Sequence, residues 1–251
     1  MSRVALDFDR IRKSFGSHVA LADVTLQVRE GELFGLAGVN GAGKTTLLKC
    51  LLDFAATDAG TIRIFGVSHR NTAARATLAF LPERFLPPYY LTGQDFLRYM
   101  LRLHAAPFSF AAVQETFAAL DLDLRALRLP VRSFSKGMTQ KLGLAACILS
   151  GKQLHILDEP TSGLDPKARA LLKAQLLALR SEGRTLFLTS HLLADVEQLC
   201  DRMAVLHDGT IRFIGAPSAL LAKYGTASME AAFLACIDAP ARIPAETVTS
   251  E

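Results

Sequence analysis

The chain contains 251 residues, of which half are apolar and 21% are charged, and its formal net charge is +4. This length is sufficient for a full hydrophobic core, and the apolar content argues against extensive disorder. No run reaches the about 18 consecutive apolar residues that span a bilayer, so we expect no membrane-spanning segment. The stretch 1–10 carries acids and lacks an apolar core, so we expect no secretory signal.

The N-terminal part has the patterns of short strands around one helix. Apolar and polar residues alternate at the start, as in a half-buried strand, and the apolar run 33–38 ends in glycine, as a buried strand does before a tight turn. The predicted strands of this part span 4–9, 24–28, 33–38, 61–66 and 77–81. Residues 44–52 (KTTLLKCLL) suit a helix that follows the third strand.

The middle of the sequence has a different character. Pro87-Pro88 interrupts the chain, and apolar residues then recur mainly at helical spacing over 92–150. We therefore predict a mostly helical segment at about 85–150, inserted between two parts of an α/β core at 1–84 and 151–237.

Strand and helix patterns alternate again in the C-terminal part. Asp165-Pro166 has the residue types of a helix start, Glu182-Gly183 those of a helix end, and Asp208-Gly209 those of a hairpin turn. The predicted elements are buried strands at 154–158 and 185–190, a helix after each, an antiparallel hairpin at 203–215 and a flexible tail at 238–251.

Residues 38–46 (GVNGAGKTT) contain the pattern GxxxxGK[ST]. Glycines let successive backbone N–H groups surround a phosphate without a Cβ in the way, and the following helix directs its positive end toward the same anion. Lys44 supplies positive charge to phosphate oxygens, and the Thr45 hydroxyl is a candidate ligand of Mg²⁺. The predicted nucleotide-binding residues of this loop are Gly38, Asn40, Gly41, Gly43, Lys44, Thr45 and Thr46. A glycine-rich turn with an incidental lysine is the alternative.

Two adjacent acids, Asp158 and Glu159, follow a predicted buried strand. A carboxylate at a strand end can hold Mg²⁺ or its water shell, and we assign this role to Asp158. Glu159 is then placed to orient and deprotonate the attacking water, as a general base does. A pair of helix-capping acids is the alternative, and the phosphate loop upstream favours the hydrolytic role.

A second candidate anion site lies in FSKGM (134–138). Ser135 precedes an amphipathic run and is a suitable N-cap, and a helix start with a serine hydroxyl, a glycine N–H and a lysine can bind an anion. In isolation, an ordinary capped helix explains the same residues.

Together, these motifs resemble those of the ATP-binding cassette (ABC) ATPases over almost the whole chain up to about residue 237. The matching segments follow the family's order: 38–46, 134–138, 155–160 (HILDEP), 162–165 (SGLD) and 189–191 (TSH). The segment 134–138 stands where the family has its LSGGQ signature. Ser135 and Gly137 match that signature, whereas Phe134, Lys136 and Met138 depart from it in a way that resembles exporter ATPases.

The resemblance implies a P-loop NTPase fold, which is a mostly parallel sheet with helices on both sides, an antiparallel β edge and an inserted helical subdomain. It implies one ABC ATPase domain at 1–237. It also implies that Phe15 stacks on adenine, although a core position for Phe15 is the alternative, and that His191 contacts the γ-phosphate. Glu83 stands where the family usually has a glutamine. A carboxylate can still bind Mg²⁺ there, but its charge disfavours ATP unless the metal offsets it.

The same resemblance implies how the protein works. ATP with Mg²⁺ is bound between two such ATPases, in a homodimer or a heterodimer, with Ser135 and Gly137 of one protomer closing over the nucleotide of the other. Hydrolysis through Glu159 reopens the dimer and drives transport, with export favoured, through a separate membrane permease. This implies a peripheral location on the cytoplasmic face of the cell membrane, and we expect no nucleic-acid partner.

Two other classes of protein share part of this pattern. A soluble ABC ATPase that acts on nucleic acid or ribosomes usually carries two cassettes or a long coiled-coil insert, and the sequence shows neither. A plain P-loop kinase lacks the combination of signature, paired acids and histidine. The Pro-rich stretch 85–91 (FLPPYYL) fits a surface that docks a cytoplasmic helix of a permease, or else a loop packed against its own helical segment.

Overall fold

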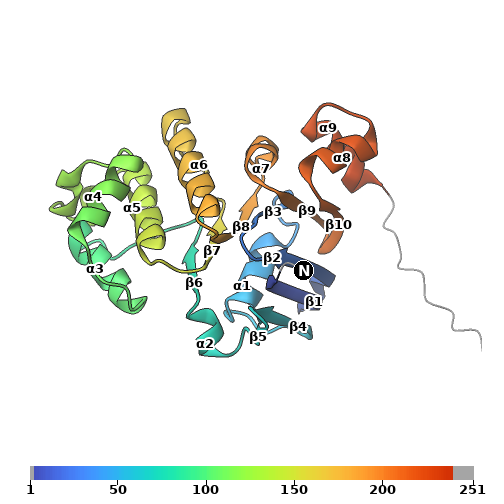
Figure 1. The fold of residues 1–251 in the computed structure, drawn as a ribbon. Helices are drawn as coiled ribbons and strands as arrows, with labels where there is room; N and C mark the ends of the chain where they lie inside the picture. Colours follow the sequence, from blue (N-terminus) through green and yellow to red (C-terminus); the bar gives the residue numbers. More distant parts are fainter. Residues whose placement is uncertain (1–2, 240–251) are drawn as a thin grey trace, which may run out of the picture.

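The structure is a computed structural model of the chain, and it describes residues 3–239. Figure 1 shows how the helices and strands of this part are arranged. The flexible tail expected at 238–251 lies outside the described residues except at its start. There, Asp238 is the last residue of helix α9 (Met229–Asp238), so this helix extends into the predicted tail.

A six-stranded sheet forms the centre of the fold, with its strands in the order β10-β9-β3-β8-β7-β6. These strands are β3 (Leu33–Ala37), β6 (Leu78–Leu81), β7 (Leu154–Asp158), β8 (Thr185–Ser190), β9 (Arg202–His207) and β10 (Thr210–Gly215). Neighbouring strands are parallel except β9 and β10, which form the predicted hairpin. Every residue of β3, β7 and β8 is buried, so the buried strands predicted from their apolar runs are confirmed.

The N-terminal strands form a second, antiparallel sheet in the order β2-β1-β4-β5. They are β1 (Val4–Phe15), β2 (His18–Arg29), β4 (Ala59–Ile64) and β5 (Val67–Ser68). Strands β1 and β2 are longer than predicted. The alternation of apolar residues is interrupted because Arg10 and Asp23 have left-handed backbones (φ 50° and 67°) and the register shifts between Phe8 and Ile11. The antiparallel part of the fold is therefore a separate sheet in addition to the edge strand β10.

Side chains from the two faces of the six-stranded sheet enter two different cores. On β8, Leu186 and Leu188 belong to the core that α6 and α7 complete, whereas Phe187 between them faces the other way. The Phe187 ring lies 6.1 Å from that of Phe8 in β1 and 5.9 Å from that of Phe34 in β3, measured between centroids. Helix α1 (Lys44–Leu51) also belongs to this second core and covers that face of the sheet.

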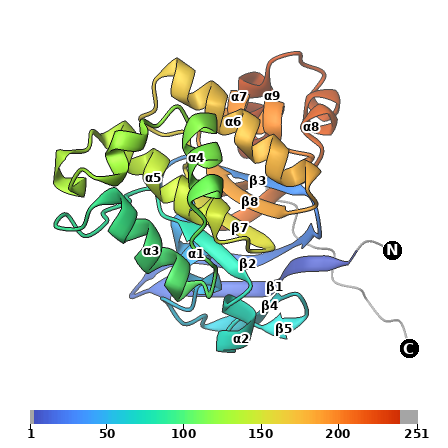
Figure 2. The same cartoon turned by 60° about the vertical axis from the view of Figure 1, so that its left-hand side comes forward.

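The stretch predicted to be mainly helical is helical in the structure, and it lies to one side of the central sheet (Figure 2). It contains α3 (Gly93–Leu103), α4 (Phe110–Ala119), the 3-10 turns η1 (Leu124–Leu127) and η2 (Val131–Ser133), and α5 (Lys136–Leu149). The preceding segment 85–91 combines the two arrangements considered for it. The Phe85 ring packs against Phe96 with centroids 5.6 Å apart, whereas Leu86, Tyr89 and Tyr90 remain exposed by 88%, 67% and 70%.

The other helices are α2 (Thr72–Arg75), α6 (Pro166–Ser181), α7 (Leu193–Leu199) and α8 (Pro217–Tyr224), besides α9. Helix α6 begins after its N-cap Asp165 and ends before Glu182, as predicted. Helices α2, α8 and α9 were not predicted. Within residues 3–239, no helix combines the length and the apolar content that crossing a membrane requires.

Candidate active site

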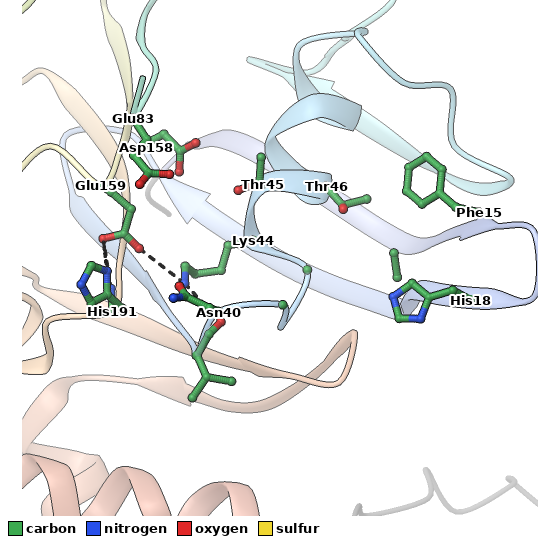
Figure 3. Close-up of a pocket in the computed structure, with 14 residues that line it drawn as sticks. Phe15, His18, Asn40, Lys44, Thr45, Thr46, Glu83, Asp158, Glu159 and His191 are labelled. Atoms are coloured by element: carbon green, nitrogen blue, oxygen red, sulfur yellow. Dashed lines mark hydrogen bonds and ion pairs between the residues drawn. The ribbon is translucent and has the colours of Figure 1, made fainter. Parts of the chain in front are cut away.

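A cavity of about 370 Å³ opens beside the carboxyl ends of β3, β7 and β8. Its lining residues are Phe15, His18, Ala20, Val39, Asn40, Gly41, Gly43, Lys44, Thr45, Thr46, Glu83, Asp158, Glu159 and His191. Figure 3 shows the three carboxylates and His191 at one end of the cavity, Phe15 and His18 at the other, and Lys44, Thr45 and Thr46 between them. Most of the residues predicted from separate motifs are thus brought together.

The loop 38–43 joins β3 to α1 and depends on two glycines. A Cβ on Gly38 would lie 2.5 Å from the Leu206 carbonyl oxygen, and one on Gly43 would lie 2.6 Å from the Ala20 carbonyl oxygen. Gly43 also has φ 108°, which L side chains rarely adopt, and it is the N-cap of α1 without a side-chain cap. The first N–H groups of α1 are therefore directed toward the cavity, as an anion-binding helix start requires.

Lys44 is the single lysine or arginine among the described residues that line this cavity. Only 7% of it is exposed, and its ammonium donates to the Gly38 carbonyl oxygen at 2.6 Å. The same ammonium lies 3.4 Å from Oε1 of Glu159. The loop thus holds one buried positive charge at the centre of the cavity, next to the acid that follows β7.

Glu159 links the phosphate loop to β8. Its Oε2 lies 2.8 Å from Nδ1 of His191 and also accepts the backbone N–H of His191 at 3.2 Å. The dashed lines in Figure 3 mark its contacts with Lys44 and His191. Glu159 is 6% exposed and has a left-handed backbone with φ 49°. A carboxylate held by three contacts from two residues, Lys44 and His191, is suited to act as a base with a fixed direction.

Asp158 is fixed by a different partner. The Thr189 hydroxyl donates to its Oδ1 at 2.6 Å, and the same hydroxyl accepts the N–H of Glu159 at 3.0 Å. Burial raises the pKa of Asp158 above its ordinary value, and the charges of Glu159 and Glu83 raise it further, whereas the Thr189 hydrogen bond and Lys44 lower it. Asp158 therefore lies in an anionic cluster with one nearby lysine.

The residues at this end of the cavity fit a magnesium ion. Asp158, Glu83 and Thr45 offer the hard oxygen donors that Mg²⁺ prefers, and all three line the cavity. Three carboxylates against one lysine also leave negative charge that a divalent cation would balance. Glu83 itself is exposed at the cavity edge, so its side chain can reach toward a metal without being fixed by the fold.

The opposite end of the cavity is formed by the turn between β1 and β2. Phe15 is 53% exposed there, so it is not a core residue, and His18 is its partner in the strand register. His18 and Ala20 line the cavity but were not predicted to do so. The sequence feature that could have predicted them is their position just after the Gly16-Ser17 turn. A hairpin brings the residues on the two sides of its turn together, so these residues lie near Phe15.

Ser135 and Gly137 do not line this cavity, and they were predicted to close over the nucleotide of a second protomer. Ser135 is exposed and caps α5, with its hydroxyl accepting the N–H of Met138 at 3.2 Å. The neighbouring Lys136 lies against the loop before α6, since a Cβ on Gly163 would be 2.7 Å from its ammonium. Gly38 is also not a lining residue, and its carbonyl oxygen accepts a hydrogen bond from the Lys44 ammonium.

Comparisons with known proteins agree on one family. A model of the ABC transporter family matches residues 21–162. The chain is 38% identical over 229 residues to the Nod factor export ATP-binding protein I of Paraburkholderia xenovorans (strain LB400), covering 89% of this chain and 74% of that protein. It is 36% identical over 232 residues to the protein of the same name from Bradyrhizobium diazoefficiens, with coverage of 89% and 74%.

Solved structures give the same result for the fold. The structure described as the ATP binding subunit of an ABC transporter superposes with a TM-score of 0.84 at 28% identity, covering 92% of this chain and 99% of that one. A dimeric post-hydrolysis ATP-binding cassette bound to ADP and Pi superposes with a TM-score of 0.76 at 20% identity, with coverage of 84% and 98%. The predicted P-loop NTPase fold is thereby confirmed.

Proposed function

The chain belongs to the ABC transporter family, and on this premise we propose that it is the ATP-hydrolysing subunit of an exporter whose membrane-spanning part is a separate permease. The observation that carries the proposal is the contact of Lys44 in the phosphate loop with Glu159, which also contacts His191, inside a single cavity. Export is favoured because the relatives at 38% and 36% identity are named as export proteins.

In this proposal the phosphates of ATP bind over the loop 38–46. The ammonium of Lys44 and the N–H groups at the start of α1 contact the phosphates, with Asn40, Gly41 and Thr46 beside them. The adenine lies at the other end of the cavity and stacks on Phe15, an interaction worth about 1–3 kcal/mol. The exposed ring and the length of the cavity between it and Glu159 support this orientation.

Mg²⁺, when bound by Thr45, Asp158 and Glu83, would neutralise charge on the phosphates and orient them for in-line attack. The protein's own residues perform the remaining steps. Glu159 accepts a proton from the attacking water, while its contacts with His191 hold the carboxylate in place. His191 is exposed enough to contact a γ-phosphate and to register its departure.

The position of Ser135 outside the cavity supports the proposal of a dimer. Ser135 and Gly137 lie at the start of α5, where a helix N-terminus and an exposed serine hydroxyl can bind an anion. We infer that they contact the γ-phosphate of ATP held by a second protomer in a head-to-tail arrangement. The partner is a second copy or a related ATPase. Residues 1–237 act as one ABC ATPase domain in this arrangement.

Replacing Ser135 by alanine tests the contact between protomers. The change removes an N-cap and costs about 1 kcal/mol of stability, and it should also abolish ATP-dependent dimerisation and lower ATPase activity. Ser109 is a matched control, since it caps α4 in the same way. Ser109→Ala should lose similar stability and keep both properties, as measured by calorimetric melting, light scattering and phosphate release. If both variants lost activity equally, Ser135 would act only as the N-cap of α5, and the proposed contact between protomers would be contradicted.

The proposed docking surface for the permease consists of Leu86, Tyr89 and Tyr90, which are highly exposed apolar or aromatic residues next to Glu83. A cytoplasmic helix of the permease would cover these residues and place the ATPase on the cytoplasmic face of the membrane. Movements of Glu83 at the cavity edge would then reach the permease directly, since only a few residues separate it from this surface.

Co-purification tests the function itself. The full chain, used as bait on detergent-solubilised membranes at about 200 mM salt, should retain a protein with several membrane-spanning helices and no nucleic acid. Tyr89→Ser with Tyr90→Ser should abolish retention, whereas Tyr99→Ser, at another exposed tyrosine, should not. Retention of nucleic acid without any membrane protein would favour the soluble ABC ATPase class instead.

A further inference from the structure

The Phe15 ring has a cation on one of its faces. The Lys13 ammonium lies 5.3 Å from the ring centroid, in the geometry of a cation–π contact. Lys13 and Phe15 are two residues apart on β1, so their side chains leave the strand on the same side. Phe15 lines the cavity described above and Lys13 does not. The ammonium thus contacts one face of a ring that lines the cavity, without being part of the lining itself.

Lys13 is itself held in place by Asp58. Its ammonium pairs with Oδ1 of Asp58 at 2.9 Å, and 15% of the Lys13 side chain is exposed. The other carboxylate oxygen, Oδ2, accepts the N–H of Ser14 at 2.6 Å, and the Asp58 N–H donates to the Arg12 carbonyl oxygen at 2.9 Å. The hydrogen bonds from Lys13 and Ser14 hold the pKa of Asp58 below its ordinary value, so the ion pair persists at neutral pH.

The contacts with Lys13 and Asp58 affect how freely the Phe15 ring can rotate. An aromatic ring that is half exposed beside a turn loses rotamer freedom when a base stacks on it, and this loss weakens binding. A cation fixed over one face restricts the ring before the nucleotide arrives. It also draws π-electron density toward itself, which favours stacking of an electron-rich purine on the opposite face.

We propose that Lys13 and Asp58 are positioning residues for the nucleobase, which hold the Phe15 ring in the orientation that stacks on the adenine of ATP. The inference rests on the proposed function, because it takes Phe15 as the group that contacts the base. It adds a specificity-determining element built from β1 and from the loop before β4, outside the phosphate and metal sites.

The test compares two probes, ATP and inorganic tripolyphosphate, each with Mg²⁺, by calorimetric titration of the full chain. Lys13→Met should raise the Kd for ATP about two- to five-fold and leave the Kd for tripolyphosphate unchanged. Asp58→Asn should act in the same direction, and Lys13→Arg should retain ATP affinity. Lys49→Met is the matched control, since Lys49 is exposed on the neighbouring helix α1, and it should change neither constant.

A double-mutant cycle shows whether Lys13 acts through the ring. Phe15→Ala should raise the Kd for ATP about 5- to 150-fold, and Lys13→Met should have no further effect in that background. The inference is overturned if Lys13→Met weakens tripolyphosphate binding equally, if its effect persists without Phe15, or if it has none. A wild-type chain that binds neither probe would instead contradict the proposed function, so the two failures are distinguishable.

Discussion

Glu159→Gln is expected to lower the rate of ATP hydrolysis by about 10²–10⁴-fold, since the amide cannot accept the proton of the attacking water. Glutamine has nearly the same shape as glutamate, and its oxygen can still accept the N–H of His191. Binding of ATP should therefore persist. Phosphate release under single-turnover conditions measures the loss, because it separates the chemical step from nucleotide binding.

The same variant should accumulate as a dimer with MgATP. If hydrolysis opens the dimer, a protein that binds ATP without hydrolysing it remains closed, and light scattering should give twice the protomer mass. Glu197→Gln is the control, since Glu197 is an exposed acid on α7 that does not line the cavity. If Glu159→Gln kept near wild-type turnover, another residue would have to act as the base. If this variant stayed monomeric with MgATP, both alone and with the permease, the head-to-tail dimer would be contradicted.

Lys44→Ala is expected to weaken ATP binding by about 10- to 150-fold, which corresponds to the loss of charged hydrogen bonds worth about 1.5–3 kcal/mol. The effect is large because no other lysine or arginine among the described residues lines the cavity. Its loss leaves the carboxylates of Glu83, Asp158 and Glu159 facing the phosphates without a protein cation between them. Calorimetric titration with MgATP measures the change in Kd.

Thermal unfolding must accompany this measurement, because Lys44 also contacts the buried carboxylate of Glu159 at 3.4 Å. Glu159 keeps its contacts with His191 in the variant, so the fold should survive with a modest loss of stability. Lys49→Ala, on the exposed side of the same helix, should leave ATP binding intact. An unchanged affinity for ATP in Lys44→Ala would contradict the assignment of loop 38–46 as the phosphate site.

The sequence was sufficient for the phosphate loop and for the helix caps at Ser135 and Asp165, which contiguous residues form. The loop 38–46 is recognisable because its glycines, lysine and threonine are contiguous, and the strand before it and the helix after it follow from local apolar patterns. The caps Ser135 and Asp165 were predicted for the same reason, since a capping side chain bonds to an N–H only three residues away.

Only the tertiary structure decided which distant residues meet. The contacts of Glu159 with Lys44 and His191 depend on the parallel order of β3, β8 and β7, and that order cannot be derived from the residues of any one strand. The positions of His18 and of the Lys13–Asp58 pair depend on the long hairpin β1–β2. The sequence pattern did not show the length of this hairpin, because the left-handed backbone of Arg10 interrupts the alternation of apolar residues. The physical reason is that local propensity acts through neighbours along the chain, whereas strand pairing and packing join residues across long loops.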